Sequence, residues 1–397
     1  MTFRLFRCGL AWLVVSLAVP IVNAAPLFDD PLFESPPVEQ QSDAELAAVL
    51  RLVNAQQIDE AEAAIRAVTE RRPRSAPAHE ILGTVLALQG DLPEAVLALK
   101  KAIELSPEQA TAFTKLGDIA LALGNGALAK DYFTQAITVQ PRERRAHQRL
   151  GLLLEREGEL ETAIHHYEQG IQGTSPAYLG IKLNLAELYV RDGRAADAID
   201  LLSLFLEPDN GAAPSPAVLR TATVAQIRLD QKDQATALAQ QLAKQSSAPQ
   251  DHFLLASLLE QTGDTRQAET TYRHILTLDD RFWPALNNLA ALLIRKGAAS
   301  QGLDYARKAY ELSDTAVQPA HTYGWALLEM GDPGEAVKVL EAAKNRKADH
   351  ALTRYHLGVA YQATGATSAA KSELQAVLEL NDQSEFAADA RQRLLNL

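Results

Sequence analysis

The sequence contains little cysteine, little methionine and few aromatic side chains. Its 397 residues include one Cys, two Met and only 6% Phe, Trp and Tyr. The single cysteine, Cys8, lies in an apolar run near the N terminus, so a chain cleaved after that run holds no cysteine. Such a chain forms no disulfide and no thiolate metal site, which excludes folds and metal centres that depend on either.

Long apolar segments are also lacking, apart from that N-terminal run. Arg4 and Arg7 precede the apolar residues 8–22, and Asn23 and Ala24 follow. This layout is typical of a secretory signal peptide over residues 1–24, with cleavage predicted after Ala24. Because the run is shorter than the roughly 20 residues of a membrane-spanning helix, we expect a periplasmic protein with no stable membrane insertion after cleavage. The alternative is an uncleaved signal that anchors the protein in the inner membrane.

Positive charge is scarce. The chain has 38 Lys and Arg against 50 Asp and Glu, a net charge of −12, and loss of Arg4 and Arg7 would make it −14. A chain this acidic repels nucleic acid and anionic lipid, so we expect no nucleic-acid partner.

Residues 25–41 are rich in Pro, Asp, Glu and Phe. They contain a near duplication, Pro-Leu-Phe-Asp-Asp followed by Pro-Leu-Phe-Glu. We interpret this segment as a flexible acidic leader. It is either a plain spacer or a docking peptide whose Phe28 and Phe33 enter an apolar groove.

What the sequence does contain is a 34-residue pattern that recurs from about Ser42 to Asp382. In residues 76–109, apolar side chains with helical spacing lie on both sides of a Gln-Gly-Asp turn and surround two small residues, Gly83 and Ala95. This spacing predicts two amphipathic helices joined by a tight turn. Self-similarity at this period predicts a stacked helical array.

These residues resemble the tetratricopeptide repeat, a helix-turn-helix unit with small residues at its eighth and twentieth positions. The resemblance covers about 340 residues. It implies an all-α, right-handed superhelical solenoid of about ten repeats with a C-terminal capping helix. The ten units start near Ser42, Ala76, Ala110, Arg144, Leu179, Val218, Pro249, Trp283, Val317 and Ala351.

The predicted repeats fall into two sets of five. Units one to five span residues 42–206, units six to ten span 218–382, and residues 207–217 insert extra loop between them. Unit six departs most from the pattern, because Lys232 replaces the turn glycine and Gln241 stands at a usual large apolar position, although Ala237 fits the small twentieth position. Residues 383–397 keep helical apolar spacing and are predicted to form the capping helix.

No motif in the sequence predicts catalysis. Residues 124–129 match a dinucleotide-binding fingerprint, but that fingerprint needs a preceding strand, and a helix is predicted there. His79-Glu80 lacks the second histidine of a zinc-protease motif, and the remaining histidines are expected on the solvated surface. The glutamates at 155, 157, 159 and 161 flank a predicted turn and are expected to be solvated. We therefore predict a protein that is not an enzyme and that has no cofactor and no metal.

The resemblance implies that the first helix of each unit lines a concave face. Its second, fifth, ninth, twelfth and thirteenth positions point inward, with the sixth at the edge. In units four and five these positions hold Arg145, Gln148, Arg149, Arg156, Asn184 and Arg191. Four arginines on neighbouring helices form a candidate anion-binding stripe. The alternative is solvated charge neutralised by Glu155 and Glu187.

Units eight to ten place different side chains on the same face. They hold Asn287, Asn288, Arg295, His321, Trp325, Tyr355 and His356. Trp325 is either part of the core or a binding anchor. We favour the binding anchor, because Tyr323 and Gly324 at the seventh and eighth positions already supply the packing contacts.

The predicted function is that of a non-enzymatic periplasmic scaffold that holds a protein or peptide partner in its concave groove. Envelope assembly or export is the expected setting, by analogy with exported members of the family. The alternative is an accessory of exopolysaccharide biosynthesis or export that binds an acidic glycan.

Overall fold

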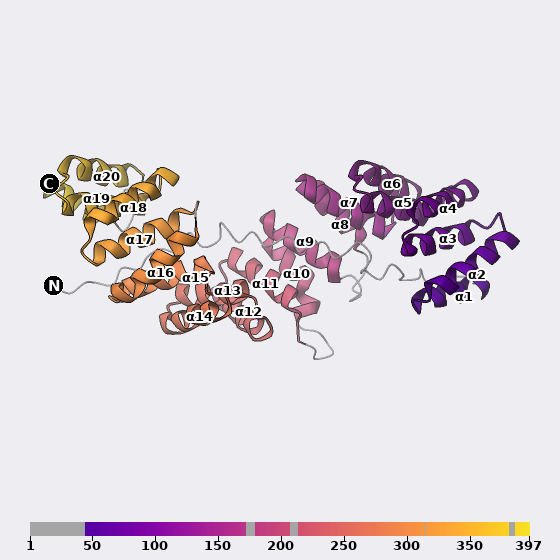
Figure 1. Ribbon diagram of the computed structural model, residues 1–397, viewed down its shortest axis with the longest axis horizontal. Coiled ribbons are helices and arrows are strands. Elements are labelled where there is room, and N and C mark those ends of the chain that lie inside the picture. Colours follow the sequence, from indigo (N-terminus) through magenta and orange to yellow (C-terminus); the bar gives the residue numbers. More distant parts are fainter. Residues whose placement is uncertain (1–43, 172–178, 207–212, 314, 381–385) are drawn as a thin grey trace. The chain divides into compact units, whose positions relative to one another are not determined.

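The computed structural model describes residues 44–171, 179–206, 213–313, 315–380 and 386–397, and every regular element in them is an α-helix (Figure 1). The predicted signal peptide, the acidic leader and residues 207–212 of the loop insertion lie outside these ranges. The chain divides into two compact units between Gly211 and Ala212. We call described residues 44–206 the N-terminal unit and described residues 213–397 the C-terminal unit.

The helices come in pairs, one pair for each repeat. In the N-terminal unit they are α1 (Ala44–Asn54), α2 (Ile58–Arg71), α3 (Ala76–Gln89), α4 (Leu92–Leu105), α5 (Ala110–Ala122), α6 (Gly126–Val139), α7 (Arg144–Glu157), α8 (Leu160–Gly170), α9 (Leu179–Arg191) and α10 (Ala195–Leu206). In the C-terminal unit they are α11 (Pro216–Arg228), α12 (Lys232–Gln245), α13 (Pro249–Gln261), α14 (Thr265–Leu278), α15 (Trp283–Arg295), α16 (Ala299–Leu312), α17 (Val317–Glu329), α18 (Pro333–Arg346), α19 (Ala351–Ala363), α20 (Thr367–Leu380) and α21 (Ala387–Leu395).

In both units, the alternate helices that lie close enough for several contacts are first helices of neighbouring repeats. Consecutive helices pack against each other, and α3 also contacts α1 and α5, while α17 also contacts α15 and α19. A stack of two helix rows curves toward the row whose helices lie closer together, because the helices of both rows have similar widths. The first helices therefore form the concave side. We call α1, α3, α5, α7 and α9 the inner row of the N-terminal unit, and α11, α13, α15, α17 and α19 the inner row of the C-terminal unit. The second helices form the outer rows.

A residue with a left-handed backbone conformation lies at the end of the first helix of each repeat. Gly90 has φ 88°, the backbone N–H of Asp91 donates to the Leu86 carbonyl, and the Asp91 side chain caps α4 by accepting from the Glu94 N–H at 3.1 Å. Eight repeats use glycine at this turn position, because glycine adopts positive φ without steric cost. Gln56 and Asp230 take the same conformation, at φ 56° and 55°.

The two helices of a repeat interlock through a small residue on the first helix and a large one on the second. A Cβ added to Gly117 would lie 2.4 Å from Cε1 of Phe133, and one added to Gly324 would lie 2.4 Å from Cγ of Leu340. Phe133 and Leu340 are themselves fully buried. The glycine therefore leaves the space that the partner side chain fills, which explains the small eighth position of the sequence pattern.

The predicted register of the sixth repeat is two residues late. Helix α11 begins at Pro216 rather than Val218, and the left-handed turn residue is Asp230 rather than Lys232. Ala235 is fully buried between the helices, whereas Ala237 is exposed. The loop insertion before this repeat shifts its first residue relative to the sequence pattern. At the turn, Asp230 replaces the expected glycine because Asp tolerates the left-handed conformation.

The C-terminal helix α21 closes the array. Ala390 of α21 packs with Leu374 and Val377 of α20 in one buried cluster. The prediction of an all-α solenoid of helix-turn-helix repeats with a capping helix is confirmed.

Candidate functional site: the inner rows of the two units

The arginines of the predicted anion-binding stripe are bonded to a carboxylate of the preceding repeat. Asp118 on α5 accepts from Nε of Arg145 at 3.0 Å and from Nε of Arg149 at 2.8 Å. The Arg149 side chain is only 10% exposed, so this contact is largely removed from water. Since one carboxylate serves two guanidinium groups, the three side chains together keep a net positive charge.

Further along the N-terminal inner row, four polar side chains tie three consecutive helices together. Tyr167 on α8 donates to Glu155 on α7 across 3.5 Å, and Arg191 on α9 donates to the other oxygen of Glu155 at 2.7 Å. Asn184 on α9 also hydrogen-bonds to the Tyr167 hydroxyl. We call Tyr167, Glu155, Asn184 and Arg191 the N-terminal quartet.

The C-terminal unit repeats this arrangement. Tyr272 on α14 donates to Glu260 on α13 at 2.8 Å and accepts from Asn288 on α15 at 3.2 Å, while Arg295 on α15 donates to Glu260. We call these four residues the C-terminal quartet. Each member lies 104 or 105 residues after its counterpart in the N-terminal quartet, which corresponds to three repeats.

The tyrosines at the centre of the two quartets are fully buried. Burial raises the pKa of both hydroxyls, and the neighbouring carboxylate raises it further. Each tyrosine therefore stays protonated and can donate to its glutamate. Because the members come from two repeats, the quartets fix how one repeat stacks on the next.

The inner row of the C-terminal unit also carries a stacked aromatic group. The Trp325 indole on α17 lies over the His356 imidazole on α19, with ring centroids 5.4 Å apart and planes 14° apart. Its Nε1 donates to Glu329 at 3.3 Å. Nε2 of His321 lies 2.8 Å from Nδ1 of His356. Trp325 is half-buried and both histidines are buried, so the indole is held in one orientation at the surface of the row.

The capping helix borders this aromatic group. Tyr355 on α19 donates to Asp389 on α21 at 2.5 Å, and its ring lies 5.0 Å from that of Phe386. Burial raises the pKa of Tyr355 to about 12, and the Asp389 carboxylate adds to the shift.

Three buried histidines of the C-terminal unit, His321, His350 and His356, have pKa values lowered below the usual range and are neutral. Burial lowers the pKa of His321 well below its usual range, and the neighbouring His356 lowers it further. Burial also lowers the pKa of His356 to about 3, with a smaller contribution from the Arg393 charge, and it lowers the pKa of His350. Two neutral imidazoles satisfy each other, because one ring nitrogen donates and the other accepts.

The expectation that the histidines are solvated is wrong for several of them. His147, His252, His321, His350 and His356 are all buried. Nε2 of His147 lies 3.1 Å from the Pro141 carbonyl, and Nε2 of His252 lies 2.9 Å from the Ser246 carbonyl. Since a carbonyl only accepts, these imidazoles donate to the linker before their own helix and so hold the start of the repeat.

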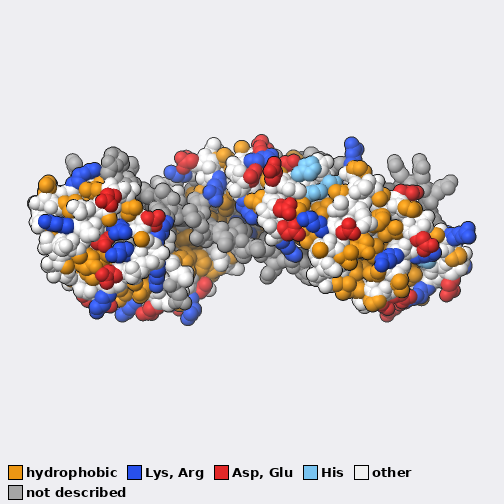
Figure 2. Space-filling model, turned by 90° about the horizontal axis from the view of Figure 1, so that it is seen from above, with side chains coloured by type: hydrophobic (Ala, Val, Ile, Leu, Met, Phe, Trp, Pro, Cys, Tyr) orange, Lys and Arg blue, Asp and Glu red, His pale blue; other side chains and the backbone are white. Residues whose placement is uncertain are grey.

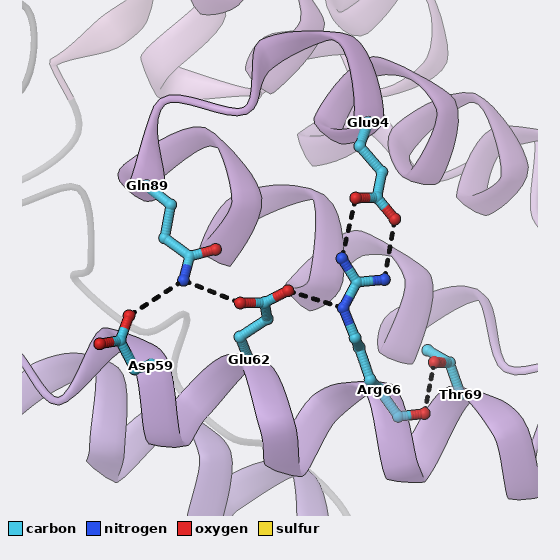
Figure 3. Close-up of polar contacts among 6 residues, drawn as sticks. All are labelled: Asp59, Glu62, Arg66, Thr69, Gln89 and Glu94. Atoms are coloured by element: carbon cyan, nitrogen blue, oxygen red, sulfur yellow. Dashed lines mark hydrogen bonds and ion pairs between the residues drawn. The ribbon is translucent and has the colours of Figure 1, made fainter.

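The outer row of the N-terminal unit carries a different polar network, drawn in Figure 3. The Arg66 guanidinium on α2 makes two hydrogen bonds of 2.8 Å to Glu94 on α4 and one of 2.7 Å to Glu62. Gln89 donates to Glu62 at 2.9 Å. The Arg66 hydrogen bonds lower the pKa of both glutamates. These groups are largely solvated, so the network joins the repeats at little net gain in stability.

Apolar side chains also reach the surface of the N-terminal unit. Figure 2 shows hydrophobic side chains gathered over this unit, at the right of the view. Leu97 on α4 is 68% exposed and Leu123, directly after α5, is 64% exposed.

Comparison with known families agrees with the repeat geometry. Three family models described as tetratricopeptide repeat match residues 46–110 and 114–178, residues 252–282, and residues 327–394. Together these ranges exceed half of the chain. The chain belongs to the tetratricopeptide repeat family.

The comparison with solved structures finds matches that share little sequence with the chain. MamA from Desulfovibrio magneticus RS-1, residues 41 to the end, is 15% identical, with 43% of this chain and 97% of that chain covered and a TM-score of 0.38. The tetratricopeptide domain of P58(IPK) is 18% identical, with 81% and 98% covered and a TM-score of 0.28. No curated protein matches the sequence.

The predicted site residues of this tetratricopeptide chain form two groups, one in each unit. In the N-terminal unit, Gln148 is half-buried on α7 and Arg156 is exposed near its end, beside the arginines and Asn184 described above. In the C-terminal unit, Asn287 is buried and donates to Asn288 at 3.1 Å, next to the quartet. The remaining members lie around Trp325.

Several side chains that complete these groups were not predicted. They are Asp118, Glu260, Tyr167, Tyr272, His350 and Asp389. A usable signal exists for some of them, because Glu155 and Arg191 lie 36 residues apart and Glu260 and Arg295 lie 35 apart. An opposite charge about one repeat away therefore indicates a contact between neighbouring inner-row helices.

The motifs with a superficial likeness to catalytic or metal sites belong to the repeat architecture. Gly124 is a turn residue with φ 74°, and Asn125 caps α6 by accepting from the Leu128 N–H at 3.1 Å. Within the described ranges, no group of three His, Cys, Asp or Glu side chains is placed to hold a metal ion. The helices described here also include none that is long and apolar enough to cross a membrane.

Proposed function

We propose that this protein is an exported, non-catalytic scaffold that holds a segment of a partner protein along its inner rows and acts in envelope assembly or export. Membership of the tetratricopeptide repeat family supports a role in protein–protein interaction. Stacked repeats form the binding surface before a partner arrives, so binding does not have to order the receptor.

The observation that carries the proposal is the fixed orientation of Trp325. The indole lies over His356 with its Nε1 bonded to Glu329, yet it is still partly exposed on the inner row. A large aromatic side chain held in place at a surface loses little conformational entropy when a partner covers it. On the neighbouring inner-row helix α19, Tyr355 lies beside His356, with ring centroids 5.2 Å apart.

Partner capture from periplasmic extract tests this role. Trp325→Ala should reduce the yield of the specific partner about tenfold, the effect of losing one well-placed anchor. Trp283→Ala is the matched control, since it makes the same change at the first residue of α15. Trp325→Phe keeps an aromatic ring and should retain most of the capture.

Circular dichroism of each variant separates binding from folding. Equal helix content with a loss confined to Trp325→Ala supports the proposal. Full capture by Trp325→Ala, or an equal loss with Trp283→Ala, contradicts a partner site at the aromatic group.

The proposed location rests on the N-terminal sequence alone. Residues 1–24 have the layout of a secretory signal, with cleavage expected after Ala24. Cell fractionation with mass measurement of the purified chain should find a periplasmic protein that begins at Ala25. An intact N terminus in the membrane fraction would favour the inner-membrane anchor, and a cytoplasmic chain would contradict export.

A further inference from the structure

Charge is segregated between the rows at the end of the N-terminal unit. The inner-row helices α7 and α9 carry six cationic side chains and three carboxylates. The outer-row helices α8 and α10 carry four carboxylates and no Lys or Arg. The cations are Arg144, Arg145, Arg149, Arg156, Lys182 and Arg191, of which Arg149 and Lys182 are buried and the other four reach the surface. A cationic surface of this kind on a chain with a net charge of −12 favours an acidic ligand.

Two of these arginines, Arg156 and Arg191, keep their guanidinium groups exposed. Asp118 accepts from both Arg145 and Arg149, and Glu155 accepts from Arg191, whose side chain is 51% exposed. An exposed guanidinium that already holds one carboxylate still presents further N–H groups to a second one.

Apolar side chains lie on the same two helices. Leu152 on α7 and Leu183 on α9 are half-buried, at the ninth and fifth positions of their repeats. The inner row of α7 and α9 therefore combines cationic and apolar groups, and a matching ligand would combine carboxylates with apolar side chains.

The chain itself contains such a segment directly before the N-terminal unit. Residues 25–43 hold five carboxylates, Asp29, Asp30, Glu34, Glu39 and Asp43, and no Lys, Arg or His. Two Leu-Phe pairs alternate with the acidic residues. Both charge and apolar content thus complement the α7 and α9 surface.

The segment is long enough to reach that surface. Its 19 residues, which end where α1 begins, span up to about 60 Å when extended. Six helix-to-helix steps separate α1 from α7 and eight separate α1 from α9, and at about 8–10 Å each they add up to no more than about 60 Å and about 80 Å along the array. The straight path across a concave face is shorter than this.

We propose that residues 25–43, the acidic leader and the two residues that join it to α1, bind to the inner row of α7 and α9 in the same chain. The leader then competes with acidic segments of partner proteins for this surface. The competition rests on the proposed function, whereas the docking of the leader does not.

Photo-crosslinking of the purified full chain tests the docking. A benzoylphenylalanine in place of Phe28, near the far end of the segment, should crosslink within its own chain, mainly to α7 and α9, as mapped by mass spectrometry at low salt. The yield should fall at least threefold in 0.5 M salt, where the Debye length is only about 4 Å. Crosslinks that map elsewhere, or adducts only of dimer size, would overturn the proposal.

Charge variants sharpen the same measurement. Replacing the leader acids by amides, with Asp29→Asn, Asp30→Asn, Glu34→Gln and Glu39→Gln, should lower the yield at least threefold, and so should Arg156→Glu on the exposed end of α7. Arg307→Glu, an equally exposed arginine on α16 of the C-terminal unit, is the matched control and should leave the yield unchanged. An unchanged yield in both test variants would overturn the proposal.

Competition distinguishes a peptide surface from a glycan surface. Poly-glutamate should displace the leader at least as well as polygalacturonate at equal carboxylate concentration. The reverse order would assign the row to an acidic glycan and overturn the proposal. Because every readout uses the isolated chain, failure here leaves the partner-capture test of Trp325 unaffected.

Discussion

The two units are built from the same repeat, yet their inner rows present different chemistry. In the N-terminal unit, α7 and α9 carry guanidinium groups shared with Asp118 and Glu155. In the C-terminal unit, α17 and α19 carry an indole stacked on buried, neutral imidazoles. The helix-packing positions fix the backbone in both units, so the inward positions are free to differ.

What the units share is as informative as what separates them. Each contains one quartet of Tyr, Glu, Asn and Arg that joins a repeat to the next one. Among the described repeats, the quartet occurs in the two whose second helix carries a tyrosine where others carry an apolar side chain such as Leu99 or Phe133. We therefore assign the quartets to repeat stacking, and the side chains that differ between the units to ligand choice.

The largest expected effect comes from filling the space between the two helices of one repeat. Gly117→Leu in the N-terminal unit and Gly324→Leu in the C-terminal unit should each cost about 3 kcal/mol or more of unfolding free energy, because even a Cβ would lie 2.4 Å from a buried side chain. Urea unfolding followed by circular dichroism measures the loss.

Tryptophan fluorescence assigns that loss to a unit. Within the described residues, Trp283 and Trp325 both belong to the C-terminal unit, so their signal should follow Gly324→Leu and not Gly117→Leu. Gly180→Ala on α9 is the control, since nothing lies within 4 Å of its added Cβ. Equal fluorescence shifts for both leucine variants would show that the units unfold together.

Acid should weaken the C-terminal unit. His321 and His356 have folded-state pKa values below that of a free histidine, about 3 for His356, so the unfolded chain binds more protons than the folded one below pH 6.5. Stability is then present at neutral pH and is lost as the pH falls toward the folded pKa. Between pH 7 and pH 5, each such histidine should lower the free energy of unfolding by about 2 kcal/mol.

The urea midpoint of tryptophan fluorescence at pH 7 and pH 5 measures this loss. His321→Gln removes one of the two imidazoles and should flatten the dependence on pH, even if the variant is less stable overall. A midpoint that stays the same at both pH values in the native chain would rule out buried neutral histidines in this unit.

A smaller difference should separate the two quartets. Tyr272→Phe removes a donor 2.8 Å from the nearly buried Glu260, and it should cost about 1–2 kcal/mol. Tyr167→Phe removes a contact of 3.5 Å to the more exposed Glu155, and it should cost less than about 1 kcal/mol. Chemical denaturation of both variants compares them, and a larger cost for Tyr167→Phe would reverse the assignment of the tighter quartet.

The smallest expected effect is a gain in stability at the two irregular turns. Gln56→Gly in the N-terminal unit should stabilise by up to about 1 kcal/mol, because glutamine pays a steric cost at φ 56° that glycine does not. Asp230→Gly in the C-terminal unit should gain less, since Asp tolerates this conformation better. Thermal melting detects both gains, and destabilisation by either glycine would mean that the native side chain makes a stabilising contact.

The repeat pattern predicted the fold because its main signals are local. Gly90 marks a turn through its own backbone conformation, and Gly83 marks a close helix crossing through its missing side chain. Asp230 gave no such signal, and a loop insertion precedes it, so the register of the sixth repeat was misplaced by two residues. The predicted register was therefore wrong where another residue type, here Asp, adopts the turn conformation that glycine adopts in most repeats.

The contacts of the inner-row residues could not be predicted in the same way. The register placed Arg149 and Arg295 on first helices, but their partners Asp118 and Glu260 lie on the helix one repeat earlier. Finding such pairs requires the rotation between repeats, which a single-unit pattern does not encode. The burial of His321 and His356 likewise depends on two inner-row helices meeting face to face.

The central claim is that partners bind to the inner rows. Site-specific photo-crosslinking in intact cells tests it most directly, with benzoylphenylalanine placed singly at Gln148 and Glu329 on the inner rows, and at Thr138 and Lys338 on the outer rows. The inner-row positions should crosslink to the same partner protein while the outer-row positions do not. Crosslinks to that partner from Thr138 and Lys338, with none from Gln148 and Glu329, would contradict the claim.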